Sequence, residues 1–159
     1  MIFKRSEEEK LLEAIENVNI EKVKTILKNS TEKNRILELN EKDKDGYYPL
    51  LRAISKNNIK IVQLLLEYAN QHQIILELNE ENKYGNYSLY WAIYNNKIEI
   101  VQLLLEYAIQ HQIIFELNER NKHGNYSLLG AISNNIDIVQ LLIEYALQHQ
   151  IILELNEKK

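Results

Sequence analysis

The chain has 159 residues, of which 45% are hydrophobic and 26% charged, with a formal net charge of −4 at pH 7. This composition is typical of a foldable globular chain, and its acidic balance leaves no basic field to neutralise phosphates, so nucleic acid is not an expected partner. Cysteine is absent, which excludes disulfides and cysteine-ligated zinc and fits a reducing compartment. The first residues are charged rather than signal-like and every apolar run is short, so we expect a cytoplasmic protein with no membrane partner.

A repeat of 39 residues organises the chain. Near-copies begin at Ala53, Ala92 and Ala131, and a more divergent copy around Ala14 precedes them. Self-similarity at such a period is the signature of a stacked repeat protein. We therefore expect a single domain over residues 1–159, made of four repeats at approximately 6–42, 43–81, 82–120 and 121–159.

Within each repeat the apolar pattern predicts a short helix followed by a long one. Pro49 suits the first turn of a helix, and Asn57 interrupts the pattern where a left-handed backbone costs asparagine little. From Ile59 apolar residues recur at spacings of three and four through Leu78, which predicts a second helix of about 20 residues. The predicted short helices span 7–17, 48–56, 87–95 and 126–134, and the long ones 20–38, 59–78, 98–117 and 136–155.

The last repeat lacks one residue after Asn135. Its apolar residues Ile132, Ile138, Val139 and Leu142 still match those of the earlier repeats in sequence. We therefore expect a shorter turn between two helices that keep their register, with Ile138 buried.

The repeat resembles the ankyrin repeat. The matching features are Asp43 and Gly46 of the turn, Pro49-Leu50 at the helix start, Ala53, and the run from Ile61 to Leu66. Departures include Tyr48 where threonine is usual, Leu51 where histidine is usual, and Asn57 where glycine is usual. The resemblance implies an all-α solenoid of four stacked helix-turn-helix units joined by projecting β-turn loops, which binds another protein.

Chemistry-bearing residues recur without forming a recognisable catalytic motif. Packed helices lie about 8 to 10 Å apart, so histidines one repeat apart cannot share a metal ion. Repeated glutamates are typical of a solvated helix face. We expect no enzyme activity, no metal site and no cofactor from the recurring residues His72, His111, His149, Glu67, Glu106 and Glu144.

Differences between the repeats concentrate on the turns and the short helices. Core residues recur because each repeat must pack against its neighbours in the same way, so positions that vary indicate a surface not constrained by packing. By resemblance this surface is the concave partner-binding face. Neutral variation is the alternative. Tryptophan and tyrosine dominate binding hot spots, so we expect Trp91 and Tyr94 at its centre and expect their loss to change stability little. The candidate partner-binding residues are Asp45, Tyr47, Arg52, Ser55, Lys56, Tyr84, Asn86, Trp91, Tyr94, His123 and Asn125.

The two ends of the array differ. Ser6 and Glu9 have the spacing of a capping box in a polar first repeat. The last predicted helix, 136–155, carries the same apolar residues as its predecessors although no repeat follows it. The alternative function is therefore a structural one, in which this helix self-associates or belongs to a longer array.

Overall fold

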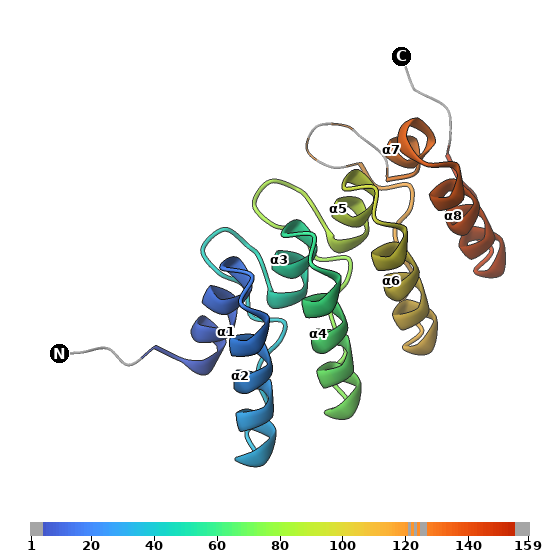
Figure 1. Cartoon of the computed structure of the whole chain (residues 1–159). Helices are drawn as coiled ribbons and strands as arrows, with labels where there is room; N and C mark the ends of the chain where they lie inside the picture. Colours follow the sequence, from blue (N-terminus) through green and yellow to red (C-terminus); the bar gives the residue numbers. More distant parts are fainter. Residues whose placement is uncertain (1–4, 121, 123, 125–126, 155–159) are drawn as a thin grey trace. The chain divides into compact units, whose positions relative to one another are not determined.

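The computed structural model describes residues 5–120, 122, 124 and 127–154, and these confirm the all-α class (Figure 1). The chain divides into two compact units, Met1–Glu77 and Leu78–Lys159. The single domain over 1–159 stays a prediction. Short and long helices alternate in the order α1 Glu7–Glu16, α2 Ile20–Glu32, α3 Pro49–Ser55, α4 Ile59–Gln71, α5 Ser88–Tyr94, α6 Ile98–Gln110, α7 Ser127–Asn134 and α8 Ile136–Gln148.

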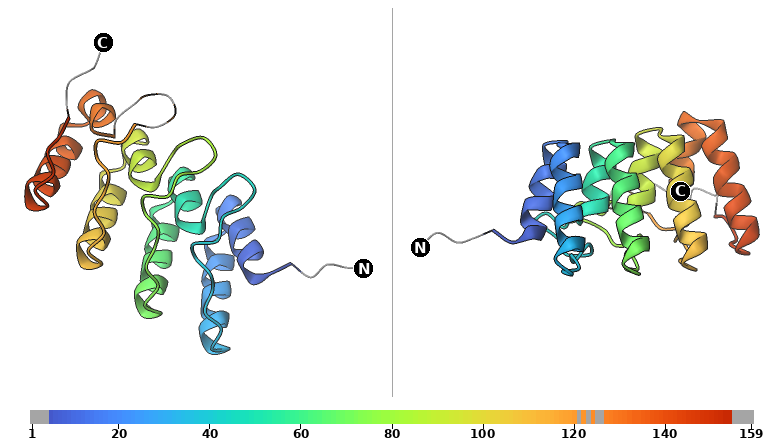
Figure 2. Two further views of the ribbon diagram at one scale, coloured as in Figure 1. Left: turned by 180° about the vertical axis from the view of Figure 1, so that it is seen from behind. Right: turned by 60° about the horizontal axis from the view of Figure 1, so that its bottom comes forward.

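Each unit has two layers, one of short helices and one of long helices. In the N-terminal unit α1 packs on α3 and α2 on α4; in the C-terminal unit α5 packs on α7 and α6 on α8 (Figures 1 and 2). The apolar positions of the repeat fill the space between the layers. Fully buried examples are Leu11, Ile15, Val23, Leu50, Val62 and Leu65 in the first unit, and Leu89, Val101, Leu104, Ile138 and Leu142 in the second.

The helix starts follow the sequence signals. Ser6 and Glu9 form the predicted capping box, in which the Glu9 N–H donates to Ser6 Oγ at 3.0 Å and the Ser6 N–H to the Glu9 carboxylate at 2.9 Å. Pro49 occupies the first turn of α3. Asn57 has a φ of 57°, and Asn58 caps α4 by accepting the Ile61 N–H at 2.9 Å.

The predicted ends of the long helices are wrong. α4 has 13 residues and ends at Gln71 rather than at residue 78. Gln73 then takes a φ of 56°, and the Ile74 N–H returns to the Ala69 carbonyl at 2.8 Å. This left-handed closure ends a helix by satisfying its last carbonyls. Asn34, Gln112 and Gln150 hold the same positive φ after α2, α6 and α8.

The residues after each long helix are extended instead. Ile75 is 54% exposed whereas Leu76 and Leu78 are 1% exposed, the alternation of an extended chain. Asn40 of the preceding repeat holds this segment, because its side chain donates to the Ile75 carbonyl at 2.8 Å and accepts the Glu77 N–H at 3.1 Å. Asn118 holds the segment after α8 in the same way, at 2.7 Å to the Ile152 carbonyl and 2.9 Å from the Glu154 N–H.

The deletion in the last repeat is absorbed between the helices, as predicted. Asn135 alone separates α7 from α8, Ile138 is 0% exposed, and Asp137 is exposed. Ile132 differs from its predecessors in its surroundings, since it is 54% exposed whereas Ile93 is 1% exposed. No described repeat follows α7 to cover it.

Candidate partner-binding site

The turns before α3 and α5 are each built by the side chain of their first residue. In the N-terminal unit Oδ1 of Asp43 accepts the N–H groups of Asp45 at 2.8 Å and Tyr47 at 3.0 Å. The Asp43 carbonyl accepts the Gly46 N–H at 2.9 Å, and Gly46 takes the positive φ of 80° that the turn requires. The turn therefore leaves Oδ2 of Asp43 free to face the short helix.

Arg52 of α3 occupies that position in the N-terminal unit. Its guanidinium lies 2.5 Å from Oδ2 of Asp43 and 3.3 Å from Glu16 of α1, and it lies 3.7 Å above the ring of Tyr47. Lys56 is ion-paired with the same Glu16 carboxylate. Arg52 and Lys56 thus both reach Glu16, and their charges are compensated within the unit.

The pKa of Asp43 records this environment. Burial raises the pKa of its carboxyl, but the hydrogen bond from Arg52 and those from the Tyr47 and Asp45 N–H groups outweigh burial and hold it below the usual 3.8. Asp43 therefore stays ionised at neutral pH.

The C-terminal unit repeats the turn with a different residue pair. Asn82 stands at the position of Asp43, and its Oδ1 accepts the N–H groups of Tyr84 at 2.9 Å and Asn86 at 3.1 Å. The Gly85 N–H donates to the Asn82 carbonyl at 3.0 Å. At the position of Arg52 stands Trp91.

An aromatic cluster, Tyr90, Trp91 and Tyr94, covers α5. Trp91 and Tyr94 meet edge to face with centroids 5.5 Å apart, and Tyr90 stacks on Tyr94 at 6.0 Å. Tyr94 is 61% exposed, while Tyr90 and Trp91 are half-buried. Because Trp91 is half-buried in this cluster, its indole contributes to packing, and the expectation that its loss changes stability little stays a prediction.

The other candidate residues differ in accessibility. Tyr47 and Asn86 are each 8% exposed, so their side chains serve the turns and offer little surface to a partner. Asp45, Ser55 and Lys56 are half-buried, and Tyr84 is 47% exposed. His123 and Asn125 lie outside the described residues.

The sequence analysis did not identify four residues that build this region, namely Asp43, Asn82, Glu16 and Tyr90. The joint change from Asp43–Arg52 to Asn82–Trp91 was the available signal.

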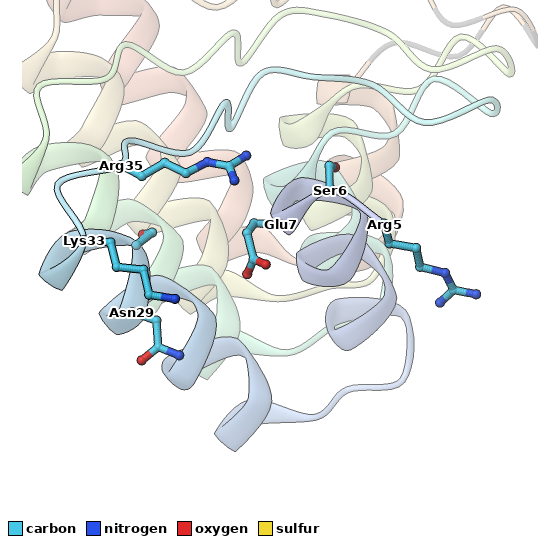
Figure 3. A pocket seen from close by; sticks show the side chains of 7 residues that line it. Arg5, Ser6, Glu7, Asn29, Lys33 and Arg35 are labelled. Atoms are coloured by element: carbon cyan, nitrogen blue, oxygen red, sulfur yellow. The ribbon is translucent and has the colours of Figure 1, made fainter. Parts of the chain in front are cut away.

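A polar pocket of about 410 Å³ lies at the start of the N-terminal unit (Figure 3). Arg5 pairs with Glu13 at 2.8 Å and Arg35 with Glu8 at 3.0 Å, and in Figure 3 the Arg5 side chain points away from Glu7 and Lys33. Two of its cations, Arg5 and Arg35, are thus compensated, and Arg5 does not converge with Lys33, so we assign the pocket no ligand. Its lining residues are Arg5, Ser6, Glu7, Asn29, Ser30, Lys33 and Arg35.

The repeated histidines pack on the tyrosine four residues earlier. The ring centroids of Tyr68 and His72 are 4.2 Å apart, and those of Tyr145 and His149 are 4.4 Å apart. Among the described residues, no three histidine, aspartate or glutamate side chains are placed to hold a metal ion. A histidine at the end of α4, α6 and α8 thus contributes to packing there.

A family model described as "Ankyrin repeats (3 copies)" matches residues 11–114 and again residues 74–154. No curated protein matches the chain in sequence. Within the described residues, no helix has the length and apolar character needed to cross a membrane.

Proposed function

We propose that this chain, which belongs to the ankyrin-repeat family, is a non-catalytic module that binds a partner protein through its turns and short helices. Ankyrin repeats are generally protein–protein interaction modules. The partner surface that we propose centres on the aromatic cluster of α5 in the C-terminal unit, and we place the module in the cytoplasm.

The aromatic cluster is the observation that supports this function. The equivalents of Tyr94 in neighbouring repeats are Ser55 and Ser133, and those of Tyr90 are Leu51 and Leu129. The repeat thus folds without aromatic rings there, yet this repeat exposes 61% of Tyr94. Exposed aromatic side chains grouped on one helix face are typical of binding hot spots.

We propose a smaller contribution to partner affinity from the charged residues of the N-terminal unit. Arg52, Lys56, Glu16 and Asp43 compensate one another, so their pairing contributes little attraction for a charged partner. Charged residues at the edge of an interface mainly set orientation and association rate. We therefore propose that affinity comes from the C-terminal unit.

Comparative affinity capture tests the proposal. The parent chain and a Tyr90→Leu/Tyr94→Ser double variant, which carries residues found in neighbouring repeats, are used as baits for quantitative mass spectrometry. Ile114→Ser, which removes an apolar side chain 55% exposed away from the short helices, is the matched control. We expect proteins that bind the parent and Ile114→Ser to be lost from the double variant. Equal recovery by all three baits would rule out the aromatic cluster as the binding site.

Self-association is a second candidate function, favoured by the outer face of the last repeat. Ile132 is 54%, Ile143 41% and Leu147 74% exposed. The equivalents of the first two in the preceding repeat, Ile93 and Leu105, are 1% and 5% exposed. Contiguous exposed apolar surface promotes association.

A further inference from the structure

Among the described residues of the α5 repeat, two buried side-chain N–H donors lack partners, one in the turn before the helix and one in the aromatic cluster. Asn82 is 3% exposed, and its Nδ2, like Nε1 of Trp91, is buried without a hydrogen-bond partner. The orientation of the Asn82 amide is fixed, because Oδ1 already accepts the N–H groups of Tyr84 and Asn86. A flipped amide would place donor against donor in the turn, so Nδ2 must be the group that points away.

At the equivalent positions of the N-terminal unit, the two side chains are hydrogen-bonded to each other. Nη2 of Arg52 donates to Oδ2 of Asp43 at 2.5 Å. The backbones of the two repeats have the same hydrogen bonds here. The N–H groups of Asp43 and Asn82 donate to the carbonyls of Tyr47 and Asn86, at 2.9 and 3.0 Å. The N–H groups of Arg52 and Trp91 donate to the carbonyls of Tyr48 and Tyr87, at 3.0 and 3.1 Å. By equivalence with this pair, the corner between the turn and the short helix carries two donors in the C-terminal unit, where it carries a donor and an acceptor in the N-terminal unit.

We propose that this corner, Asn82 Nδ2 with Trp91 Nε1, is a subsite for a neutral carbonyl oxygen, supplied by the main chain of an extended segment of the partner protein. The inference rests on the proposed function and names the chemistry of its partner. A buried donor without a partner costs about 1 to 3 kcal/mol, and one carbonyl oxygen has two lone pairs with which to accept both N–H groups.

A neutral acceptor fits better than a carboxylate. Both donors are uncharged, and Trp91 stands where Arg52 supplies a cation in the other unit. A carboxylate buried at this corner would lose its hydration in exchange for hydrogen bonds from uncharged donors alone, whereas an amide carbonyl carries no net charge to desolvate.

Tyr94 and Gly130 provide the access. In the N-terminal unit Glu16 of α1 contacts Arg52 of α3; the equivalent residues of α5 and α7 are Tyr94 and Gly130. Gly130 presents no side chain, and a Cβ built on it would meet only Ile93 Cγ2, at 3.8 Å. The largely exposed Tyr94 ring therefore has room to turn toward α7, which uncovers the indole edge for the incoming carbonyl.

The chain contains one tryptophan, so a single indole N–H resonance reports on the subsite. The ¹⁵N-labelled chain is titrated with N-methylacetamide, a neutral amide carbonyl, and separately with acetate. We expect N-methylacetamide to move the indole N–H resonance downfield to a plateau, and acetate at equal concentration to move it less. The Tyr94→Ser variant, which keeps both donors and removes the ring that packs against the indole, should respond at lower N-methylacetamide concentration.

An Asn82→Asp variant is the matched test, because its carboxylate supplies the acceptor internally as Asp43 does. We expect its indole resonance to lie downfield without any additive and to ignore N-methylacetamide. No shift in either the parent or Tyr94→Ser overturns the subsite, as does an equal response in Asn82→Asp. A stronger response to acetate overturns the neutral acceptor in favour of a carboxylate. The affinity capture described above is read separately: partners lost from the Tyr90→Leu/Tyr94→Ser bait, with a silent indole, would sink the subsite and leave the proposed function standing.

Discussion

The hydroxyl of Thr31 lies 2.9 Å from Nε2 of His72 and joins the ends of the first two long helices. The corresponding pair in the C-terminal unit is Ile109 and His149. An isoleucine cannot form that hydrogen bond, and Nε2 of His149 is accordingly buried without a partner. The same position of the repeat is thus satisfied in one unit and frustrated in the other.

Replacing Ile109 by threonine should stabilise the C-terminal unit by about 1 kcal/mol, because it supplies the missing partner of His149. Ile109 is already 40% exposed, so little apolar burial is lost. Denaturant unfolding measures the midpoint at unchanged slope. The reciprocal control, Thr31→Val, should lower the free energy of unfolding by about 1 to 3 kcal/mol by orphaning His72. A destabilised Ile109→Thr would contradict the proposed pairing.

The left-handed residue after α4 gives a second prediction. Gln73 has a φ of 56°, where a side chain costs about 1 kcal/mol or more and glycine costs little. Gln73→Gly should therefore raise the midpoint of thermal unfolding, and Gln71→Gly, placed inside the last turn of the helix, should lower it. The two variants share the same loss of side chain, so an equal effect of both would show that φ is not the cause.

The sequence predicts where the helices start better than where the long helices end. Helix starts were predictable because Ser6, Pro49 and Asn58 carry recognised signals. The ends of the long helices were not, because Gln73 sits where glycine usually marks the end, and Ile75 and Leu78 continue a three-residue spacing compatible with a helix. The period-two alternation of Leu76, Glu77 and Leu78 was the contrary signal, and it spans too few residues to outweigh the helical one.

The candidate surface was predictable in part for a similar reason. Variation between repeats pointed to Arg52, Trp91 and Tyr94, but it did not show that Arg52 is held by Asp43 and Glu16. Nor did it show the orphaned donors of Asn82 and Trp91. Both depend on how side chains from separate elements meet, which a repeat pattern does not contain.

The Asp43–Arg52 pair predicts a pH dependence. Because the folded pKa of Asp43 lies below the unfolded value near 3.8, its contribution to stability is present above that value and is lost as the pH falls through the folded pKa. Urea unfolding of the parent and of Asp43→Asn, the residue found at 82, should differ most near neutral pH, and the difference should shrink once the pH falls below the unfolded value near 3.8 and through the folded pKa. A difference that stays constant down to acid pH would show that the carboxylate charge is unimportant.

The outer face of the last repeat predicts association. If it self-associates, the parent should grow in apparent mass with concentration in light scattering, and Leu147→Lys, at a position 74% exposed, should shift it toward the monomer. Ile114→Lys is the control, because its position is exposed to a similar degree in earlier repeats, 55% at Ile36 and 54% at Ile75. A parent that stays monomeric at high concentration rules out this second function.

The division between core and binding surface gives the last prediction. Leu105 is 5% exposed, so Leu105→Ala should cost about 2 to 5 kcal/mol of folding stability through the cavity it leaves. Tyr94→Ser introduces the residue that stands at 55 and 133. Because Tyr94 is 61% exposed, this change should alter folding stability by only about 0.5 kcal/mol.

Once a partner is captured, its Kd for the Tyr94→Ser variant should rise about thirtyfold, since a hot-spot truncation costs about 2 kcal/mol. Trp91→Ala is a poorer probe, because the half-buried indole contributes to packing as well as to the proposed surface. Calorimetric titration of the partner together with thermal unfolding separates the two effects. If Tyr94→Ser unfolds like Leu105→Ala, or binds as tightly as the parent, the partner surface does not lie on the aromatic cluster.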